Sequence, residues 1–526
     1  MIKNLMIILT FALLLAAPAM AANVTAVEIH GVVFDSSKTY NTTSFVWDAQ
    51  NFTGFWYASG SGKSSETLTI NQLTESLKVN NRMIQQENLL YNTSRTDTNY
   101  TLYTETGKKV DYGLSTGYIK GATGGKYAQL GWFGDIYVAV NGKANKLTKL
   151  IKSQKKDEKQ TLKLGTSWNL GEGYNLTVES LDPETSPRQA LLNFTKDGKT
   201  IDNKVVNEGE VYTYVEKSVS GESNVPVFVT YVESIFKGGE GMSALVQLRY
   251  TWLISQNVLE IKAGDKFGVF EVKEANENYV LLYNKEKTIN LDQNTVQMLY
   301  GDLKFRVADS STALRFYPIL EKKAPGKYEV RGGTYDQKIF TNLVWDAQRF
   351  PGFWYALGSG KSSEKLSIVN QNATSLTFSS RVIQQENLLY NTSRTDTNYT
   401  LYTETGKKVD YGLSTGYIKG ATGGKYAQLG WFGDIYVAVN GKANKLTKLI
   451  KSQKKDEKQT LKLGTSWNLG EGYNLTVESL DPETSPRQAL LNFTKDGKTI
   501  DNKVVNEGEV YTYVEKSVSG ESNVPV

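Results

Sequence analysis

Residues 190–201 read ALLNFTKDGKTI, and this stretch decides how the chain folds. Apolar Leu192 and Phe194 alternate with polar Asn193 and Thr195, which is the period of a β-strand with one buried face. The Asp-Gly pair that follows favours a two-residue turn, because such a turn needs positive φ at both positions. The stretch therefore predicts an antiparallel hairpin.

The same pattern recurs along the chain, and no stretch sustains the apolar period of a long amphipathic helix. Further strands are expected at residues 135–140, before the Asn141-Gly142 turn, and at 174–179, 211–215, 245–253, 267–272, 279–283 and 303–307. Short strands joined by tight turns are typical of sandwiches and barrels. We expect an all-β protein.

A long internal repeat organises the chain. Residues 84–227 recur without a single change as residues 383–526, which is 144 residues at an offset of 299. Upstream the copies differ but still align, with FVWDAQNFTGFWY at 45–57 matching LVWDAQRFPGFWY at 343–355. A unit of this length can hold two sandwiches and is too long for a solenoid repeat. We predict unit 1 at 28–327 and unit 2 at 328–526, each with two β-sandwich subdomains.

Unit 2 stops within a predicted strand. Unit 1 continues past Val227 with FVTYV and about 100 further residues, whereas unit 2 ends at Val526 inside the same apolar run. A domain cut within a strand would expose a sheet edge. We expect unit 2 to be truncated at its C-terminal end, or else to depend on partners.

The first 22 residues, MIKNLMIILTFALLLAAPAMAA, have the features of a secretory signal peptide. One basic residue precedes an apolar run, and small residues at Ala19 and Ala21 suit a cleavage site. The run is short for a membrane span, and no later stretch approaches 18 continuous apolar residues. We expect an exported, cell-surface protein whose given chain carries no membrane anchor.

Composition excludes several chemistries. There is no cysteine and only one histidine, His30, which excludes disulfides, Cys/His zinc sites, thiol nucleophiles and iron–sulfur clusters. Residues 60–64 read GSGKS, but Tyr57 stands where a phosphate-binding loop needs glycine, so we expect a turn. The net charge of +5 is spread among mixed signs, which gives no nucleic-acid footprint. We expect no catalytic, cofactor-binding or metal-ligating residue.

Two alternatives stay open, one enzymatic and one not. Paired carboxylates could hydrolyse glycosides without histidine, although no spacing singles out two of the acidic residues. The repeated aromatic block, with Trp56 in one copy and Trp354 in the other, could form a sugar-stacking platform of an exported adhesin or carbohydrate-binding protein. Its apolar flanks and glycine turn favour a buried core or a seam between subdomains instead.

Asn-x-Ser/Thr sequons are frequent, and each is a candidate for N-glycosylation in an exported protein. In residues 174–179 and 192–196, a strand period places Asn and Thr on the polar face and Leu, Val or Phe on the core face. The candidates are Asn23, Asn41, Asn51, Asn92, Asn99, Asn175, Asn193, Asn372, Asn391, Asn398, Asn474 and Asn492.

An ordered set of blocks resembles the duplicated domain of the surface-layer (S-layer) tile proteins of methanogenic archaea of the Methanosarcina type. The blocks are WDAQ…GFWY at 47–57, LNFTKDGK at 192–199, VPVFV at 225–229, YTWLI at 250–254, GDKFG at 264–268, FRVAD at 305–309 and LRFYP at 314–318. The resemblance covers nearly the whole chain after the signal peptide.

The resemblance implies a structural, non-enzymatic role. Such proteins have two tandem units of paired β-sandwiches, are N-glycosylated, and tile with copies of themselves into a hexagonal sheet with narrow pores outside the cytoplasmic membrane. Family members usually end in a tether and a transmembrane helix, which the given sequence does not contain. Tandem rigid β modules suit a lattice, which needs broad self-complementary surfaces.

Overall fold

A computed structural model describes residues 26–526 except 41, 59–60, 72, 74–76, 111–123, 239–242, 324–329, 336–342, 370–380, 410–422, 454 and 456. The predicted signal peptide and the predicted unit boundary at 327/328 lie outside these residues. Strands dominate, and every pairing between the described strands is antiparallel, as expected for an all-β protein. The described α-helices, α2 (Thr101–Thr106) and α3 (Thr400–Thr405), have six residues each.

The first sandwich of unit 1 packs a five-stranded sheet against a six-stranded one around a single apolar core. Buried Trp47 on one sheet meets Phe305 and Phe316 on the other, with ring centroids 5.6 and 6.0 Å away. The five-stranded sheet comprises β1 (Val27–His30), β2 (Phe34–Asp35), β26 (Val296–Tyr300), β27 (Leu303–Val307) and β28 (Arg315–Lys322). The six-stranded sheet runs β22 (Lys266–Phe267), β23 (Phe270–Ala275), β24 (Tyr279–Tyr283), β9 (Leu89–Ser94), β6 (Glu66–Asn71) and β3 (Ser44–Asp48).

Smaller pairings extend the first sandwich. They are β7 (Leu77–Lys78) with β8 (Asn81–Ile84) and β25 (Ile289–Asn290), and the hairpin of β4 (Tyr57–Ala58) with β5 (Lys63–Ser64). The hairpin covers the predicted turn in the GSGKS segment, and the copy in unit 2 pairs β30 (Tyr355–Ala356) with β31 (Lys361–Ser362) in the same way. The turn prediction is therefore confirmed.

The second sandwich of unit 1 packs an eight-stranded sheet against a four-stranded one. Phe194 of the smaller sheet stacks on Phe228 of the larger at 4.5 Å. The larger sheet contains β10 (Thr96–Asn99), β11 (Lys126–Trp132), β12 (Asp135–Ala139), β13 (Lys146–Ser153), β14 (Lys159–Lys163), β19 (Val211–Val219), β20 (Glu222–Phe236) and β21 (Leu245–Glu260). The smaller contains β15 (Ser167–Gly171), β16 (Tyr174–Asp182), β17 (Gln189–Lys196) and β18 (Lys199–Asn207).

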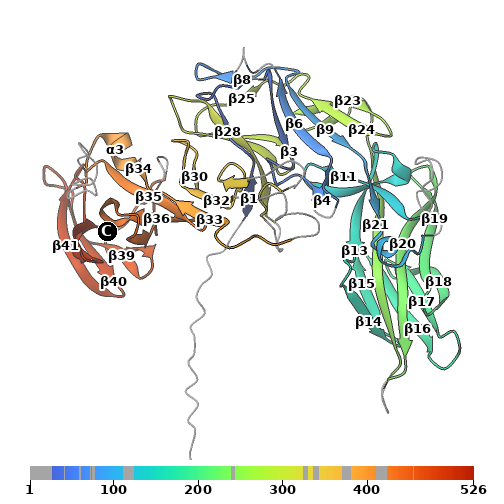
Figure 1. Cartoon of the computed structure of the whole chain (residues 1–526). Coiled ribbons are helices and arrows are strands. Elements are labelled where there is room, and N and C mark those ends of the chain that lie inside the picture. Colours follow the sequence, from blue (N-terminus) through green and yellow to red (C-terminus); the bar gives the residue numbers. More distant parts are fainter. Residues whose placement is uncertain are drawn as a thin grey trace, which may run out of the picture.

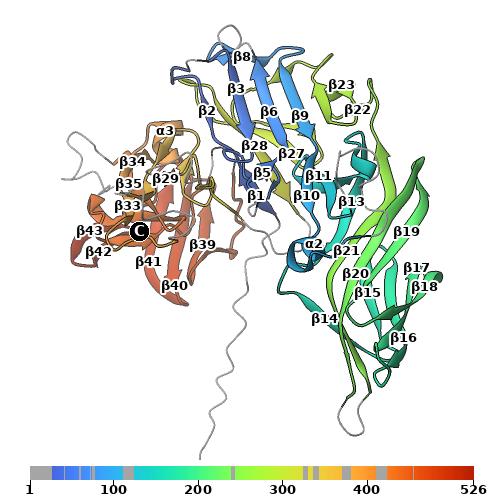
Figure 2. The ribbon, with the colours of Figure 1, turned by 45° about the vertical axis from the view of Figure 1, so that its right-hand side comes forward.

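The second sandwich is inserted into the first. The chain leaves the six-stranded sheet at the end of β9, builds the whole second sandwich, and returns so that β24 pairs with β9. In Figure 1 the blue and yellow strands of the first sandwich accordingly lie together, with the cyan and green second sandwich below them. Figure 2 shows the long strands β20 and β21 running the length of the second sandwich, from its lower tip up toward the first.

Unit 2 repeats the same hairpins and forms the separate orange and red lobe of Figure 1. Its sheets are β29 (Leu343–Asp346), β32 (Glu364–Ile368) and β33 (Leu388–Thr392); β34 (Thr395–Asn398), β35 (Lys425–Trp431), β36 (Asp434–Ala438) and β37 (Leu446–Lys448); β38 (Ser466–Gly470), β39 (Tyr473–Asp481), β40 (Gln488–Lys495) and β41 (Lys498–Asn506); and β42 (Val514–Val518) with β43 (Glu521–Pro525).

One predicted strand is wrong. Residues 267–272 do not form a single strand but the end of β22, a turn and the start of β23. Gly268 has φ +63°, and a Cβ there would lie 2.0 Å from the carbonyl oxygen of Leu299, so only glycine fits this turn. The predicted Asp197-Gly198 hairpin is confirmed, with both turn residues at positive φ.

Candidate functional site

The two sandwiches of unit 1 are joined at a buried carboxylate. Glu66, the first residue of β6, is 1% exposed. Its Oε1 atom accepts hydrogen bonds from the Tyr91 hydroxyl and the Gly134 backbone N–H, both at 2.8 Å. Its Oε2 atom accepts one from the Trp56 backbone N–H at 2.9 Å. Because Gly134 belongs to the β11–β12 turn, one side chain connects both sandwiches. We name these four residues the carboxylate joint.

A second group of hydrogen bonds supports the joint. The Tyr91 hydroxyl accepts from the Phe133 N–H at 2.8 Å, and the two rings stack with centroids 4.2 Å apart. The Gly131 N–H donates to the Ser65 hydroxyl at 2.7 Å, and the Thr93 hydroxyl donates to the Gly131 carbonyl at 2.7 Å. The end of β11 is therefore fixed to β6 and β9 by both backbone and side chains.

The joint leaves no room beside the carboxylate. A Cβ on Gly131 would lie 2.0 Å from Glu66 Oε2, which is well inside van der Waals contact. Burial raises the pKa of Glu66 to about 7, although the three donors favour the ionised form and lower it. The carboxyl group is thus buried, closely packed against Gly131, and hydrogen-bonded through both of its oxygens.

Unit 2 builds the same joint. Glu364 is 1% exposed and accepts hydrogen bonds from the Trp354 N–H at 2.9 Å, the Tyr390 hydroxyl at 2.8 Å and the Gly433 N–H at 2.9 Å. Glu66 was only one acidic residue among many in the sequence. The signal that could have found it is the Ser-Ser-Glu triplet kept in both copies upstream of the identical block.

The aromatic block is buried, as the favoured interpretation predicts. Trp47 is 0% exposed, Trp56 7% and Trp354 8%. The indole N–H of Trp47 donates to the Val32 carbonyl at 2.7 Å. Rings enclosed in this way cannot form an exposed sugar-stacking platform, so the adhesin hypothesis loses the residues on which it rested.

The single histidine lies where units 1 and 2 meet. The His30 ring packs on Tyr317 with centroids 5.0 Å apart, and its Nδ1 is 3.0 Å from the Gly31 carbonyl oxygen. Burial lowers the pKa of His30, which favours the neutral form of the ring. Across the described residues, no three His, Cys, Asp or Glu side chains gather as a metal site would need.

The contact between the units combines polar and apolar groups. The Val33 N–H donates to Gln348 Oε1 at 2.8 Å, and Arg315 donates to the Gly358 carbonyl at 2.9 Å. Arg315 also pairs with buried Asp35 at 2.8 Å. Tyr355 packs against an apolar cluster on the outer face of β28. Unit 2 is thereby docked on unit 1 through specific side chains.

The sequons of the four-stranded sheets face outward. Leu176 and Phe194 are 0% exposed, whereas Asn175 and Asn193 beside them lie on the opposite face. The Asn193 amide donates to Glu179 Oε1 at 2.6 Å, and its copy makes the same bond in unit 2. This confirms the predicted split between the polar and core faces of these strands.

The other candidate asparagines occupy varied places. Asn99, Asn391 and Asn398 are exposed at or near strand ends, Asn474 and Asn492 repeat the outward positions of unit 1, and Asn92 lines a groove. The Asn51 amide is engaged in a turn, where it donates to the Val46 carbonyl at 2.8 Å. Asn23, Asn41 and Asn372 lie outside the described residues.

In the described part of the chain, no helix is long and apolar enough to cross a membrane. Some of the surface charges form ion pairs. Residues 149–159 contain five lysines, and two of these are paired: Lys156 with Glu105 at 2.9 Å and Lys159 with Glu233 at 3.2 Å.

Comparison with known proteins identifies the family. The Major S-layer protein of Methanosarcina mazei is 29% identical over 506 residues, which cover 93% of this chain and 67% of the relative. Those of Methanosarcina barkeri and Methanosarcina acetivorans are 29% and 28% identical over 503 residues, again covering 67% of each relative. A model of the S-layer protein family matches residues 36–309 and 334–526, one region in each repeat. Since the two regions span most of its length, the chain belongs to the S-layer protein family.

Proposed function

We infer that this protein is a structural subunit of a cell-surface S-layer and that it associates with copies of itself. The observation that carries this inference is the match of both tandem units to the S-layer family, together with relatives named Major S-layer proteins. The family and these relatives point to a structural rather than an enzymatic role. The coat would enclose the cell and act as a molecular sieve.

The geometry supports such a role. A lattice repeats regularly only when every copy presents its contact surfaces at the same relative angles. Insertion of one sandwich into the other links them by two chain crossings, and the carboxylate joint fixes the angle at which they meet. The docked unit 2 adds a third module of defined orientation.

Several finer features belong to the same proposal. We propose a hexagonal lattice, tandem units at 28–327 and 328–526, export by the signal peptide at 1–22, and glycans on outward-facing sequons such as Asn175 and Asn193.

Electron microscopy of native cell envelopes, and of protein purified from them, tests the proposal. We expect ordered two-dimensional arrays that cover the surface and reform from purified protein, with six-fold symmetry in their diffraction. Arrays of another symmetry would correct the lattice geometry alone. A protein that stays monomeric at all concentrations and forms no array would overturn the structural role.

A further inference from the structure

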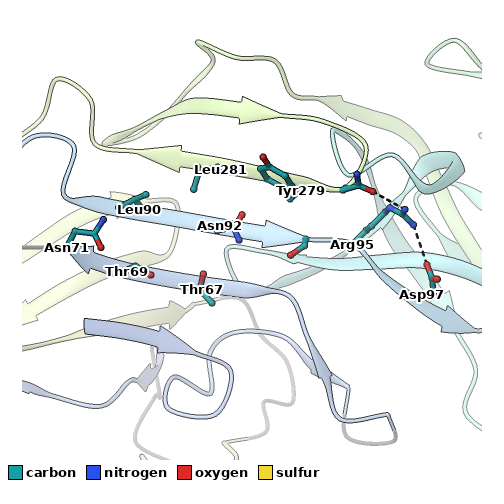
Figure 3. Close-up of a pocket in the computed structure, with 11 residues that line it drawn as sticks. Thr67, Thr69, Asn71, Leu90, Asn92, Arg95, Asp97, Tyr279 and Leu281 are labelled. Atoms are coloured by element: carbon teal, nitrogen blue, oxygen red, sulfur yellow. Dashed lines mark hydrogen bonds and ion pairs between the residues drawn. The ribbon is translucent and has the colours of Figure 1, made fainter. Parts of the chain in front are cut away.

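The outer face of the six-stranded sheet carries an open groove of about 720 Å³. Its floor is made by three adjacent strands, β6, β9 and β24, whose outward side chains are shown in Figure 3. In the strand register, Thr67 lies opposite Asn92 and Asn92 opposite Leu281, while Ser94 lies opposite Tyr279. Polar and apolar side chains therefore stand in rows across the groove at the strand spacing of about 4.8 Å.

The groove closes where the chain bends from the first sandwich into the second. Arg95 lies at this bend, between the end of β9 and the start of β10. Its guanidinium donates to Asn278 Oδ1 at 3.0 Å, and it pairs with Asp97 at 3.5 Å (Figure 3). The only charged groups among the lining residues thus neutralise each other.

Most polar side chains of the floor are available to a ligand, the exception being the Oδ1 atom of Asn92, which is shielded from solvent. Within the described residues, no hydrogen bond involves the side chains of Thr67, Thr69, Asn71 or Ser94, and Asn92 Oδ1 is shielded without a partner. The four-stranded sheet behaves differently, since Glu179 there accepts hydrogen bonds from two neighbouring asparagine amides. Unsatisfied hydroxyl and amide groups in a concave surface are suited to ligand recognition.

We propose that this groove binds a neutral saccharide chain. Hydroxyl and amide side chains match the donors and acceptors of sugar hydroxyls, and the Tyr279 ring and Leu281 offer apolar surface to sugar C–H faces. The paired Arg95 and Asp97 leave no net charge to attract a phosphate or a cation. The site stands on the groove itself and does not depend on the lattice role.

The saccharide could come from two sources. Asn92-Thr-Ser94 is itself a sequon, so a glycan attached to Asn92 could lie in the groove, or a free chain of the envelope could bind there. Unit 2 supplies an internal control, because it has the same Asn-Thr-Ser sequence at Asn391. That residue is exposed, and no described strand pairs with β33 as β24 pairs with β9.

The test uses the full chain made in a bacterial host that lacks N-glycosylation. Neutral hexasaccharides of glucose, mannose, galactose and N-acetylglucosamine are titrated by calorimetry, with a sulfated hexasaccharide as anionic comparison. We expect saturable binding of at least one neutral probe, weakened at least tenfold by Tyr279→Ala and by Asn92→Ala. Thr67→Val, which keeps the shape of the side chain, should weaken it several-fold, whereas Asn391→Ala should leave it unchanged.

In these titrations the proposal would be overturned by no saturable binding of any neutral probe, by equal weakening by Asn391→Ala, or by tighter binding of the sulfated chain. The source is then read from protein purified from native cells. A glycan on Asn92 that blocks the probes identifies the attached chain as the occupant, and an unmodified Asn92 with undiminished binding identifies a free one. A glycan on Asn92 that leaves probe binding intact would also contradict the proposal.

Discussion

Replacing Glu66 with glutamine tests whether the carboxylate joint holds the two sandwiches together. The Glu66 carboxyl oxygens accept three hydrogen bonds, from the Trp56 and Gly134 N–H groups and from the Tyr91 hydroxyl. Glutamine offers one oxygen and a donor amide, so one partner N–H or O–H would face another donor. A buried donor left without an acceptor costs about 1–3 kcal/mol. Near pH 5 the buried Glu66 carboxyl is protonated and carries a single donor hydrogen, whereas the glutamine NH2 carries two. We therefore expect Glu66→Gln to destabilise unit 1 by about this amount at that pH.

The raised pKa of Glu66 also predicts how the free energy of unfolding changes with pH. Burial raises the pKa of Glu66 from 4.5 to about 7. Below pH 4.5 Glu66 is protonated in both the folded and the unfolded protein, and its contribution to folding stability is fully present. As the pH rises, the carboxyl of the unfolded protein ionises first, and this contribution is lost progressively until the pH has passed about 7. The interval between the two values corresponds to roughly 3 kcal/mol. Glu66→Gln, which cannot ionise, should remove this loss.

Chemical denaturation followed by tryptophan fluorescence measures both effects, since Trp56 contacts the joint directly. Unfolding free energies are compared at several pH values from 4.5 to 8. Glu179→Gln is the matched control, because it makes the same change on the exposed face of the four-stranded sheet. If Glu66→Gln resembled this control in stability and kept the wild-type pH slope, the carboxylate would not be the structural joint described above.

Three further substitutions probe neighbouring features. Gly131→Ala should destabilise unit 1 by more than about 3 kcal/mol or prevent soluble expression, because its methyl group would overlap the Glu66 carboxylate; a wild-type melting temperature would contradict this. Trp56→Ala should lower the free energy of unfolding, measured with denaturant, by about 3–5 kcal/mol, as expected for a core aromatic ring. No change in this free energy would contradict the burial of Trp56. Arg315→Ala should cost about 3–5 kcal/mol because it leaves Asp35 buried without its partner. Burial raises the pKa of Asp35, but hydrogen bonds from Ser37 and Arg315 outweigh burial, and the net pKa lies below its usual value. The stability of the wild type should therefore fall as the pH falls through this pKa, and that of the variant should fall less. Equal acid profiles of the two proteins in calorimetry would contradict the pairing.

The sequence predicted what local patterns encode. The Asp197-Gly198 turn, the outward face of Asn193 and the burial of the aromatic block all follow from short-range periodicity, and each is found. The insertion of one sandwich into the other was not predicted. It depends on the pairing of β9 with β24, two strands between which the whole second sandwich lies in the sequence. Such a long-range pairing is decided by how side chains pack in the assembled core, and local patterns do not specify it. The groove and the role of Glu66 follow from this pairing and could not precede it.

The two identical copies of the repeated block show which features the block specifies by itself and which depend on other parts of the chain. The hairpins β17–β18 and β40–β41 have the same sequence and the same register, so the block itself specifies them. Strand β13 spans eight residues beside β21, whereas its copy β37 spans three, and no described strand of unit 2 takes the place of β21. Phe133 is 6% exposed under the strands of residues 266–300, and its copy Phe432 is 68% exposed. Closing a sandwich is therefore encoded outside the repeated block, in residues that bring a second sheet onto hairpins already able to form.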